Sequence, residues 1–144
     1  MRIKRRATAS WQGTAADGSG RIEVGSGAFK GPFSEKARVE DTAATNPEEL
    51  IGAAHAGCFT MSVANLLGKH GTPAEKLSTT ATVHLAPQGG RFSITLIELA
   101  LTGSVTGVDE EAFQRLAREA KESCPVSRAL AGTEIALTAT LDAR

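Results

Sequence analysis

The chain has 144 residues, which suits one compact domain with a core that needs no metal or disulfide staple. Its 16 basic residues balance its 16 acidic residues, whereas sequence-independent nucleic-acid binding needs a positive surplus. The apolar stretches are far shorter than the ~20 residues that cross a bilayer. We therefore expect neither a nucleic acid nor a membrane as partner.

The N-terminus is basic over residues 1–6. A secretory signal would continue with an apolar stretch of about 7–15 residues, and none follows. The sequence therefore predicts a cytoplasmic protein.

Short strands and turns are predicted for the first forty residues. Apolar and polar residues alternate over residues 3–11, and a turn signal at 17–20 precedes a candidate return strand at 21–24. Glycine and proline at 25–27 and 31–32 are expected to interrupt any further regular element.

A long helix is predicted from Pro47 to His70. Asn46 is a favourable N-cap, proline suits the first helical position, and Glu49 can complete a capping box. Gly71 suits the residue that follows a helix. Glycine and alanine dominate residues 52–57, which favours close approach of another backbone.

The second half of the chain predicts a hairpin, a helix and a closing strand. Residues 77–85 and 92–101 are the hairpin strands, and a phase shift in the second indicates a bulge or burial on both faces. Asp109 caps the next helix, which breaks at Cys124 because Pro125 follows. Residues 135–141 close the chain. This order predicts an α+β fold with largely antiparallel sheet.

The chain has two cysteines, Cys58 and Cys124. A static structural disulfide is unexpected in a reducing cytosol. Two inert buried thiols, or a transient catalytic or sensing pair, are both compatible with the count. Metal ligation is less favoured because no C-x-x-C motif is present.

Two segments carry a family resemblance. Residues 45–59, which read TNPEELIGAAHAGCF, and residues 120–127, which read AKESCPVS, resemble the OsmC/Ohr family of osmotically inducible and organic hydroperoxide resistance proteins. Arg38, just before the long helix, resembles the OsmC branch. The resemblance implies a single OsmC-like domain over 1–144, with sheets packed around a long central helix in an intertwined homodimer.

The resemblance also implies a thiol peroxidase that reduces organic hydroperoxides. Cys58 matches the peroxidatic cysteine and Cys124 the resolving cysteine, while Arg38 and Glu48 match the residues that activate the thiol. A dithiol, on a lipoyl protein, is the implied reductant. Sulfur supplies the redox chemistry, so no metal or other cofactor is expected.

Helix geometry adds an independent inference. Glu48 and Cys58 are ten residues apart, which is about 15 Å along one helix and about 80° around it. Their side chains cannot meet within one helix. If they share a site, Glu48 comes from a second subunit, and we predict an obligate homodimer.

Other readings stay open at this point. His55 lies one turn before Cys58, so the two could form the dyad of a cysteine hydrolase or acyl transferase. His55, Cys58 and Cys124 could also bind a metal ion. A stress-induced binding protein with inert buried cysteines is a non-enzymatic alternative.

Overall fold

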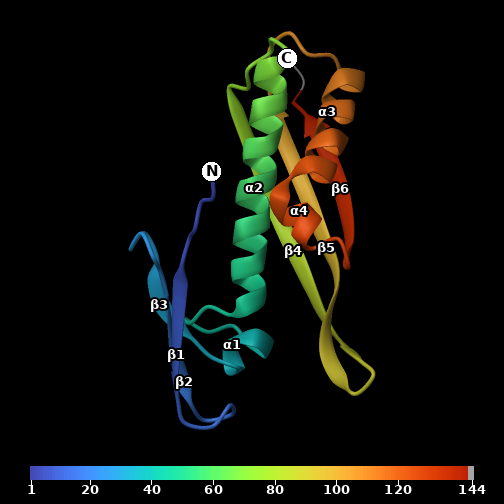
Figure 1. The fold of residues 1–144 in the computed structure, drawn as a ribbon. Helices are drawn as coiled ribbons and strands as arrows, with labels where there is room; N and C mark the ends of the chain where they lie inside the picture. Colours follow the sequence, from blue (N-terminus) through green and yellow to red (C-terminus); the bar gives the residue numbers. More distant parts are fainter. Residues whose placement is uncertain (143–144) are drawn as a thin grey trace. The chain divides into compact units, whose positions relative to one another are not determined.

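The structure, a computed structural model, describes residues 1–142 (Figure 1). The chain forms two compact units, residues 1–50 and 51–144, so the single domain stays a prediction. The elements are β1 (Ala7–Gln12), β2 (Ser19–Val24), β3 (Lys30–Phe33), α1 (Lys36–Val39), α2 (Pro47–Lys69), β4 (Lys76–Gln88), β5 (Arg91–Ser104), α3 (Glu110–Ser123), α4 (Pro125–Ala129) and β6 (Glu134–Leu141).

The first unit contains an antiparallel sheet in the order β1-β2-β3. The hairpin is confirmed, although its first strand begins at Ala7 and not at residue 3. The expectation that Pro32 interrupts regular structure is wrong, because it lies inside β3 opposite Arg21. An edge strand tolerates proline since the missing N–H can face outward.

The long helix α2 is confirmed within one residue of its expected end. Asn46 Oδ1 accepts from the Glu49 backbone N–H at 2.8 Å, as expected of an N-cap. The Glu49 carboxylate accepts from the Thr45 hydroxyl at 2.6 Å. Glu49 therefore ties the helix start to the incoming chain in place of the expected capping box.

The expectation that no apolar stretch approaches membrane length is wrong for α2. This helix of 23 residues is long and apolar enough to cross a bilayer by length and composition. Alanine contributes to the apolar mean hydropathy of α2, whose large apolar residues do not form one continuous run. Phe59, Val63 and Leu67 are fully buried in the protein core, whereas only 28% of the apolar window of α2 as a whole is buried.

The second unit contains the sheet β4-β5-β6. β4 and β5 pair antiparallel through a two-residue turn at Gly89 and Gly90, whose positive φ angles of 60° and 80° suit glycine. The register shifts where His84 faces Leu96 and Leu85 faces Ile94. This bulge explains the phase shift in the sequence.

The closing strand β6 pairs parallel to β5. The chain leaves β5, passes through α3 and α4, and returns in the same direction, as a helical crossover requires. The α+β class with largely antiparallel sheet is confirmed, with this one parallel pair added.

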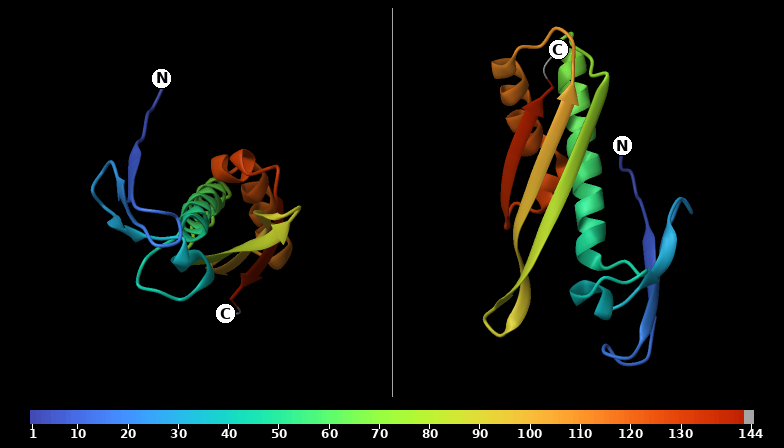
Figure 2. Two further views of the ribbon diagram at one scale, coloured as in Figure 1. Left: turned by 90° about the horizontal axis from the view of Figure 1, so that it is seen from below. Right: turned by 180° about the vertical axis from the view of Figure 1, so that it is seen from behind.

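Helices α2 and α3 cover one face of the β4-β5-β6 sheet (Figure 2). Asp109 Oδ1 accepts from the Ala112 N–H at 2.7 Å and caps α3, as expected. The core between helices and sheet is apolar, and its fully buried large side chains include Phe59, Val63, Leu67, Ile97, Leu99, Leu101 and Phe113.

Candidate active site

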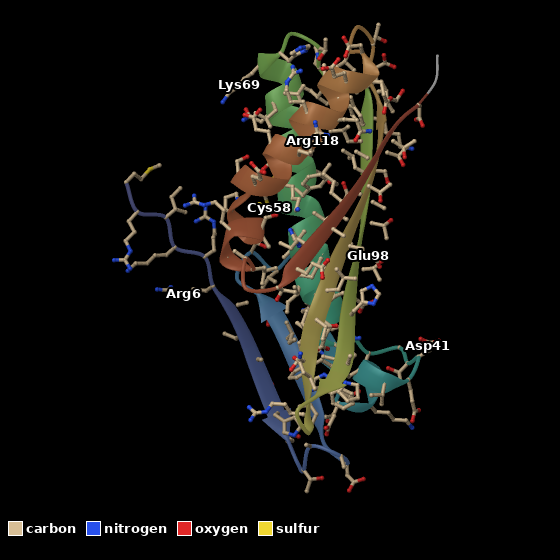
Figure 3. The ribbon with its side chains drawn as sticks, turned by 90° about the vertical axis from the view of Figure 1, so that its right-hand side faces the viewer. Arg6, Asp41, Cys58, Lys69, Glu98 and Arg118 are labelled. Carbon is tan, nitrogen blue, oxygen red and sulfur yellow. The ribbon has the colours of Figure 1, made fainter. Side chains whose placement is uncertain are left out.

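The two cysteines meet in the core of the second unit. Cys58 lies in the middle of α2 (Figure 3), and Cys124 is the residue between α3 and α4. Their sulfur atoms are 2.9 Å apart, and both thiols are free. A disulfide needs about 2.0 Å between its sulfurs, so a shift of about 1 Å would join the two.

The break before Pro125 brings Cys124 to Cys58. Cys124 ends α3 and precedes α4 with φ −57° and ψ 125°, an extended ψ that the following proline favours. Cys124 is fully buried, whereas Cys58 is partly exposed. Of the two thiols, Cys58 is therefore the one that a solute can reach first.

The thiols differ in acidity as well as in exposure. Burial raises the pKa of Cys58, and its hydrogen bond with Cys124 raises it further, against a favourable backbone hydrogen bond from Val126. Burial disfavours the Cys124 thiolate too, yet the pKa of Cys124 is lowered by hydrogen bonds from Cys58, from the Ser127 backbone and hydroxyl, and from Val126. Cys58 needs a further stabilising charge to become the reactive thiolate.

Arg38 and Glu48 form the second pair of candidate residues. Arg38 Nε donates to Glu48 Oε2 at 3.2 Å, and Nη2 lies 3.1 Å from Oε1. This two-point contact orients the guanidinium plane. The Glu48 side chain is 13% exposed and that of Arg38 is 31% exposed, so the cation keeps an open side.

A cavity of about 470 Å³ adjoins Arg38 in the first unit. The rings of Trp11 and Phe33 form its apolar wall, with centroids 5.3 Å apart. Gly20 permits this ring packing, because a Cβ there would come within 2.6 Å of both rings. No sequence pattern predicts these lining residues as a group, although the alternation over residues 3–11 predicts a strand at Trp11.

His55 is fully buried, and its Nε2 lies 2.7 Å from Ser127 Oγ. His55 therefore hydrogen-bonds a serine and not Cys58, which disfavours the Cys–His dyad of a hydrolase. Burial lowers the pKa of His55, so its imidazole is neutral near pH 7. No cluster of three or more His, Cys, Asp or Glu side chains suited to a metal ion occurs within residues 1–142.

One face of α2 is exposed along most of its length. Met61 is 69% exposed, and a Cβ at Gly57 or Gly68 would meet no atom within 4 Å. This small-residue face lies within an arc of about 100°. It consists of Ala54, Gly57, Met61, Ala64, Asn65 and Gly68.

The structure thus brings the four predicted site residues together as two pairs, Cys58 with Cys124 and Arg38 with Glu48. The thiols lie in the second unit, and the ion pair lies in the first. α2 carries both Glu48 and Cys58, ten residues apart on one continuous helix.

Comparison with known proteins gives a consistent result. The family model for OsmC-like protein matches residues 40–139. The chain is 39% identical over 131 residues to "Peroxiredoxin OsmC" of Escherichia coli (strain K12). The matched region covers 90% of this chain and 92% of that protein. It is 35% identical over 99 residues to "Organic hydroperoxide resistance protein" of Xanthomonas axonopodis pv. citri, which covers 67% and 66% of the two chains.

Solved structures support the fold. An OsmC-like protein of unknown function from Vibrio cholerae superposes with a TM-score of 0.79 at 18% identity. The match covers 96% of this chain and 99% of the Vibrio chain.

Proposed function

Because the chain belongs to the OsmC family, we propose that it is a thiol peroxidase that reduces organic hydroperoxides to alcohols. The observation that carries the proposal is the pair of free thiols 2.9 Å apart, one partly exposed and one buried. The names of the relatives, a peroxiredoxin and an organic hydroperoxide resistance protein, support the reaction class and the substrate class.

In the proposed reaction Cys58 is the peroxidatic cysteine. Its thiolate attacks the terminal oxygen of the hydroperoxide, the O–O bond breaks, and the departing alkoxide takes up a proton to become the alcohol. Cys58 is left as a sulfenic acid. Cys124 then attacks the Cys58 sulfur, the S–O bond breaks, and the hydroxide that leaves takes up a proton to become water. The product is a Cys58–Cys124 disulfide.

An external dithiol completes the cycle. One thiolate of the reductant attacks the disulfide, and its second thiol releases the mixed disulfide, so that two electrons return to the cysteines. A dithiol suits this step because its own ring closure drives the release. We propose a lipoyl protein as this partner. We place the protein in the cytoplasm, where the surrounding reductants keep such thiols reduced.

Arg38 is proposed to stabilise both the Cys58 thiolate and a peroxide oxygen. Burial and the contact with Cys124 raise the pKa of Cys58, so a nearby cation is needed to favour its thiolate. Arg38 has the open side and the fixed charge for this role, and Glu48 holds its plane. The Trp11 and Phe33 wall of the adjoining cavity offers the apolar surface for the organic substituent.

We propose that the complete site forms between two copies of the chain. Glu48 and Cys58 are separated by about 15 Å along α2 and by about 80° around it, so they cannot share a site within one helix. A homodimer in which one copy supplies Cys58 and Cys124, and the other Arg38 and Glu48, removes this conflict. The exposed small-residue face of α2 supports such an association, because it permits close approach of a second helix.

A stoichiometric oxidation tests the reaction. The reduced protein is mixed with one equivalent of tert-butyl hydroperoxide, free thiols are titrated, and the peptides are mapped by mass spectrometry. The proposal predicts rapid loss of two thiols and a Cys58–Cys124 disulfide. Cys124→Ser is expected to lose one thiol and to progress to sulfinic acid when more peroxide is present. Two thiols that persist for minutes in the wild-type protein would contradict the proposal.

Steady-state turnover identifies the reductant. Lipoyl protein, thioredoxin and glutathione are compared at equal thiol concentration with the same hydroperoxide. The proposal predicts the fastest turnover with the lipoyl dithiol. Equal or faster turnover with glutathione would contradict the choice of a dithiol.

A further inference from the structure

His55 is a buried titratable group that the proposed reaction does not use. It has no exposed surface, and its Nε2 makes a 2.7 Å hydrogen bond with Ser127 Oγ. Ser127 is only 5% exposed, so this bond is shielded from solvent. The Nδ1 atom of His55 is also buried and has no hydrogen-bond partner among the described residues. Burying an imidazole with one unpaired nitrogen is unfavourable, and the bond to Ser127 offsets part of that cost.

The His55–Ser127 bond joins α2 to the segment that carries Cys124. His55 precedes Cys58 by three residues on α2, and Ser127 follows Cys124 by three residues. Residues three apart on a helix lie one turn from each other on the same face. The polar contact and the sulfur contact therefore bridge the same two segments about one turn apart.

The backbone of Cys124 is part of the α4 hydrogen-bond ladder. The Arg128 N–H donates to the Cys124 carbonyl at 3.0 Å, and the Leu130 N–H donates to the Val126 carbonyl at 2.9 Å. Cys124 and Ser127 are therefore held in one short, internally bonded segment. A contact that keeps Ser127 on α2 keeps Cys124 there as well.

The two sulfurs differ in their access to a reductant. Cys124 is fully buried, whereas Cys58 is partly exposed. The rate of thiol–disulfide exchange depends on access to the sulfur that is attacked. Because the sulfurs are already 2.9 Å apart, forming the disulfide needs a shift of only about 1 Å, and we expect this difference in access to persist in the oxidised protein. A second copy of the chain would cover more surface and could not expose Cys124.

We propose that the His55–Ser127 bond is a latch that keeps the Cys124 sulfur covered, so that the reductant attacks the disulfide at Cys58 and not at Cys124. The inference rests on the proposed peroxidase reaction and adds His55 and Ser127 to it as positioning residues. A thiolate of the reductant bonds to the Cys58 sulfur, the Cys58–Cys124 bond breaks, and Cys124 leaves as a thiolate.

The second half of the exchange also takes place at Cys58. The other thiol of the reductant attacks the reductant sulfur that is bonded to Cys58, and Cys58 leaves as a thiolate. The reductant becomes a cyclic disulfide and has given up two electrons, one to each cysteine. The protons of its two thiols pass to the cysteines. Cys124 is a leaving group in this sequence and never bonds to the reductant.

A cavity of about 290 Å³ indicates what the latch keeps closed. Its lining includes Ser127, Arg128 and Lys121 but not Cys124. Ser127 thus borders an open space on α4, while the sulfur three residues earlier has no access to solvent. Releasing the segment from His55 would let Cys124 reach solvent from this side.

Mapping the first exchange tests the proposal in the wild-type protein. The disulfide is made with diamide, so that the test does not depend on peroxidase activity. The oxidised protein is mixed with mercaptoethanol, a monothiol that stops at the mixed disulfide, and N-ethylmaleimide caps the released cysteine. Mass spectrometry then counts the adducts. We expect mercaptoethanol on Cys58 to exceed that on Cys124 about tenfold, because attack on Cys124 requires loss of a buried hydrogen bond. Equal adducts, or an excess on Cys124, would overturn the inference.

Variants of the latch should change the position of attack. Ser127→Ala and His55→Leu each remove one partner and should raise the ratio of Cys124 to Cys58 adducts about tenfold. His55→Gln keeps a donor near the Nε2 position and should stay close to wild type. Ser123→Ala is the matched control, because its hydroxyl donates to the Glu119 carbonyl at 2.8 Å on the exposed side of α3. We expect the wild-type ratio for this control.

Hydrogen exchange measures the latch in the reduced protein, without a disulfide. The amides of Arg128 and Leu130 are bonded within the Cys124 segment, and we expect them to exchange about tenfold faster in Ser127→Ala and in His55→Leu. Wild-type exchange in both variants, or wild-type adduct ratios in both, would overturn the inference. The wild-type mapping needs no variant and stands even if His55→Leu folds poorly. A wild-type protein that diamide oxidises but tert-butyl hydroperoxide does not would instead overturn the proposed peroxidase reaction.

Discussion

The sulfur pair and the ion pair are built in different ways. Cys58 and Cys124 are 66 residues apart in the sequence and meet in an apolar core. Arg38 and Glu48 are ten residues apart and meet near the surface of the first unit. The cysteine pair brings two thiols together, but its buried surroundings disfavour a negative charge on Cys58. The Arg38–Glu48 pair fixes the position of a positive charge but contains no thiol. The comparison indicates that each pair supplies what the other lacks.

Replacing Cys58 should have the largest effect on peroxidase turnover. Cys58→Ser should reduce peroxidase turnover below detection, because an alcohol cannot form the sulfenic acid or the disulfide. Turnover with tert-butyl hydroperoxide and a dithiol measures it. Ser62→Ala, a change on the same helix outside the sulfur pair, serves as control. Substantial turnover in Cys58→Ser would assign the chemistry to another residue.

The ion pair carries the next largest effect. Arg38→Met should lower kcat/KM about 100-fold, the order observed when one preorganised donor is removed from an active site. The raised pKa of Cys58 would then act unopposed, so the thiolate fraction and the rate should increase with pH between about 7 and 9. The wild-type rate should change much less over this range. Arg118→Met, on the exposed face of α3, is the matched control.

The apolar wall next to Arg38 should influence which hydroperoxide is preferred. Phe33→Ala should raise the KM for cumene hydroperoxide about tenfold and leave hydrogen peroxide almost unaffected, because the latter has no apolar part to bury. Phe29→Ala changes an exposed aromatic residue that does not line the cavity and should have no such effect. Equal changes in KM for both peroxides would contradict a role of this cavity in substrate binding.

The smallest expected effect is on stability and concerns Asn46, which connects the segment of Arg38 to the start of α2. Asn46 caps α2 through Oδ1, and its Nδ2 donates to the Ala37 carbonyl at 2.9 Å. Asn46→Ala should lower the free energy of unfolding by about 1 kcal/mol, measured by urea denaturation at fixed protein concentration. Asn65→Ala, on the exposed face of the same helix, tests whether the loss belongs to the cap. A larger loss for Asn65→Ala would indicate that this face is buried in the assembly.

Much of this arrangement could be predicted from local sequence signals. The start of α2 follows from Asn46 and Pro47, the bulge from the phase shift after residue 96, and the break at Cys124 from Pro125. The family resemblance, carried by the segments around the two cysteines, is confirmed. These features depend on neighbours in the chain, which the sequence displays directly.

Other features depend on contacts across long distances. Neither the bond between His55 and Ser127 nor the pairing of Trp11 with Phe33 is encoded in a local pattern. The parallel pairing of β6 depends on how the crossover through α3 packs. The sequence predicts a break at Pro32, because its place on an edge strand becomes visible only when the sheet is formed.

The central claim, that the two pairs meet across a dimer, can be tested by complementation. A Cys58→Ser chain and an Arg38→Met chain are given different affinity tags and co-expressed, and the mixed dimer is isolated through both tags. In a symmetric dimer with shared sites, the mixed species has one site with both defects and one intact site, so it should show about half the wild-type activity per dimer. A mixed dimer no more active than its two parent variants, or a fully active monomer, would contradict the account.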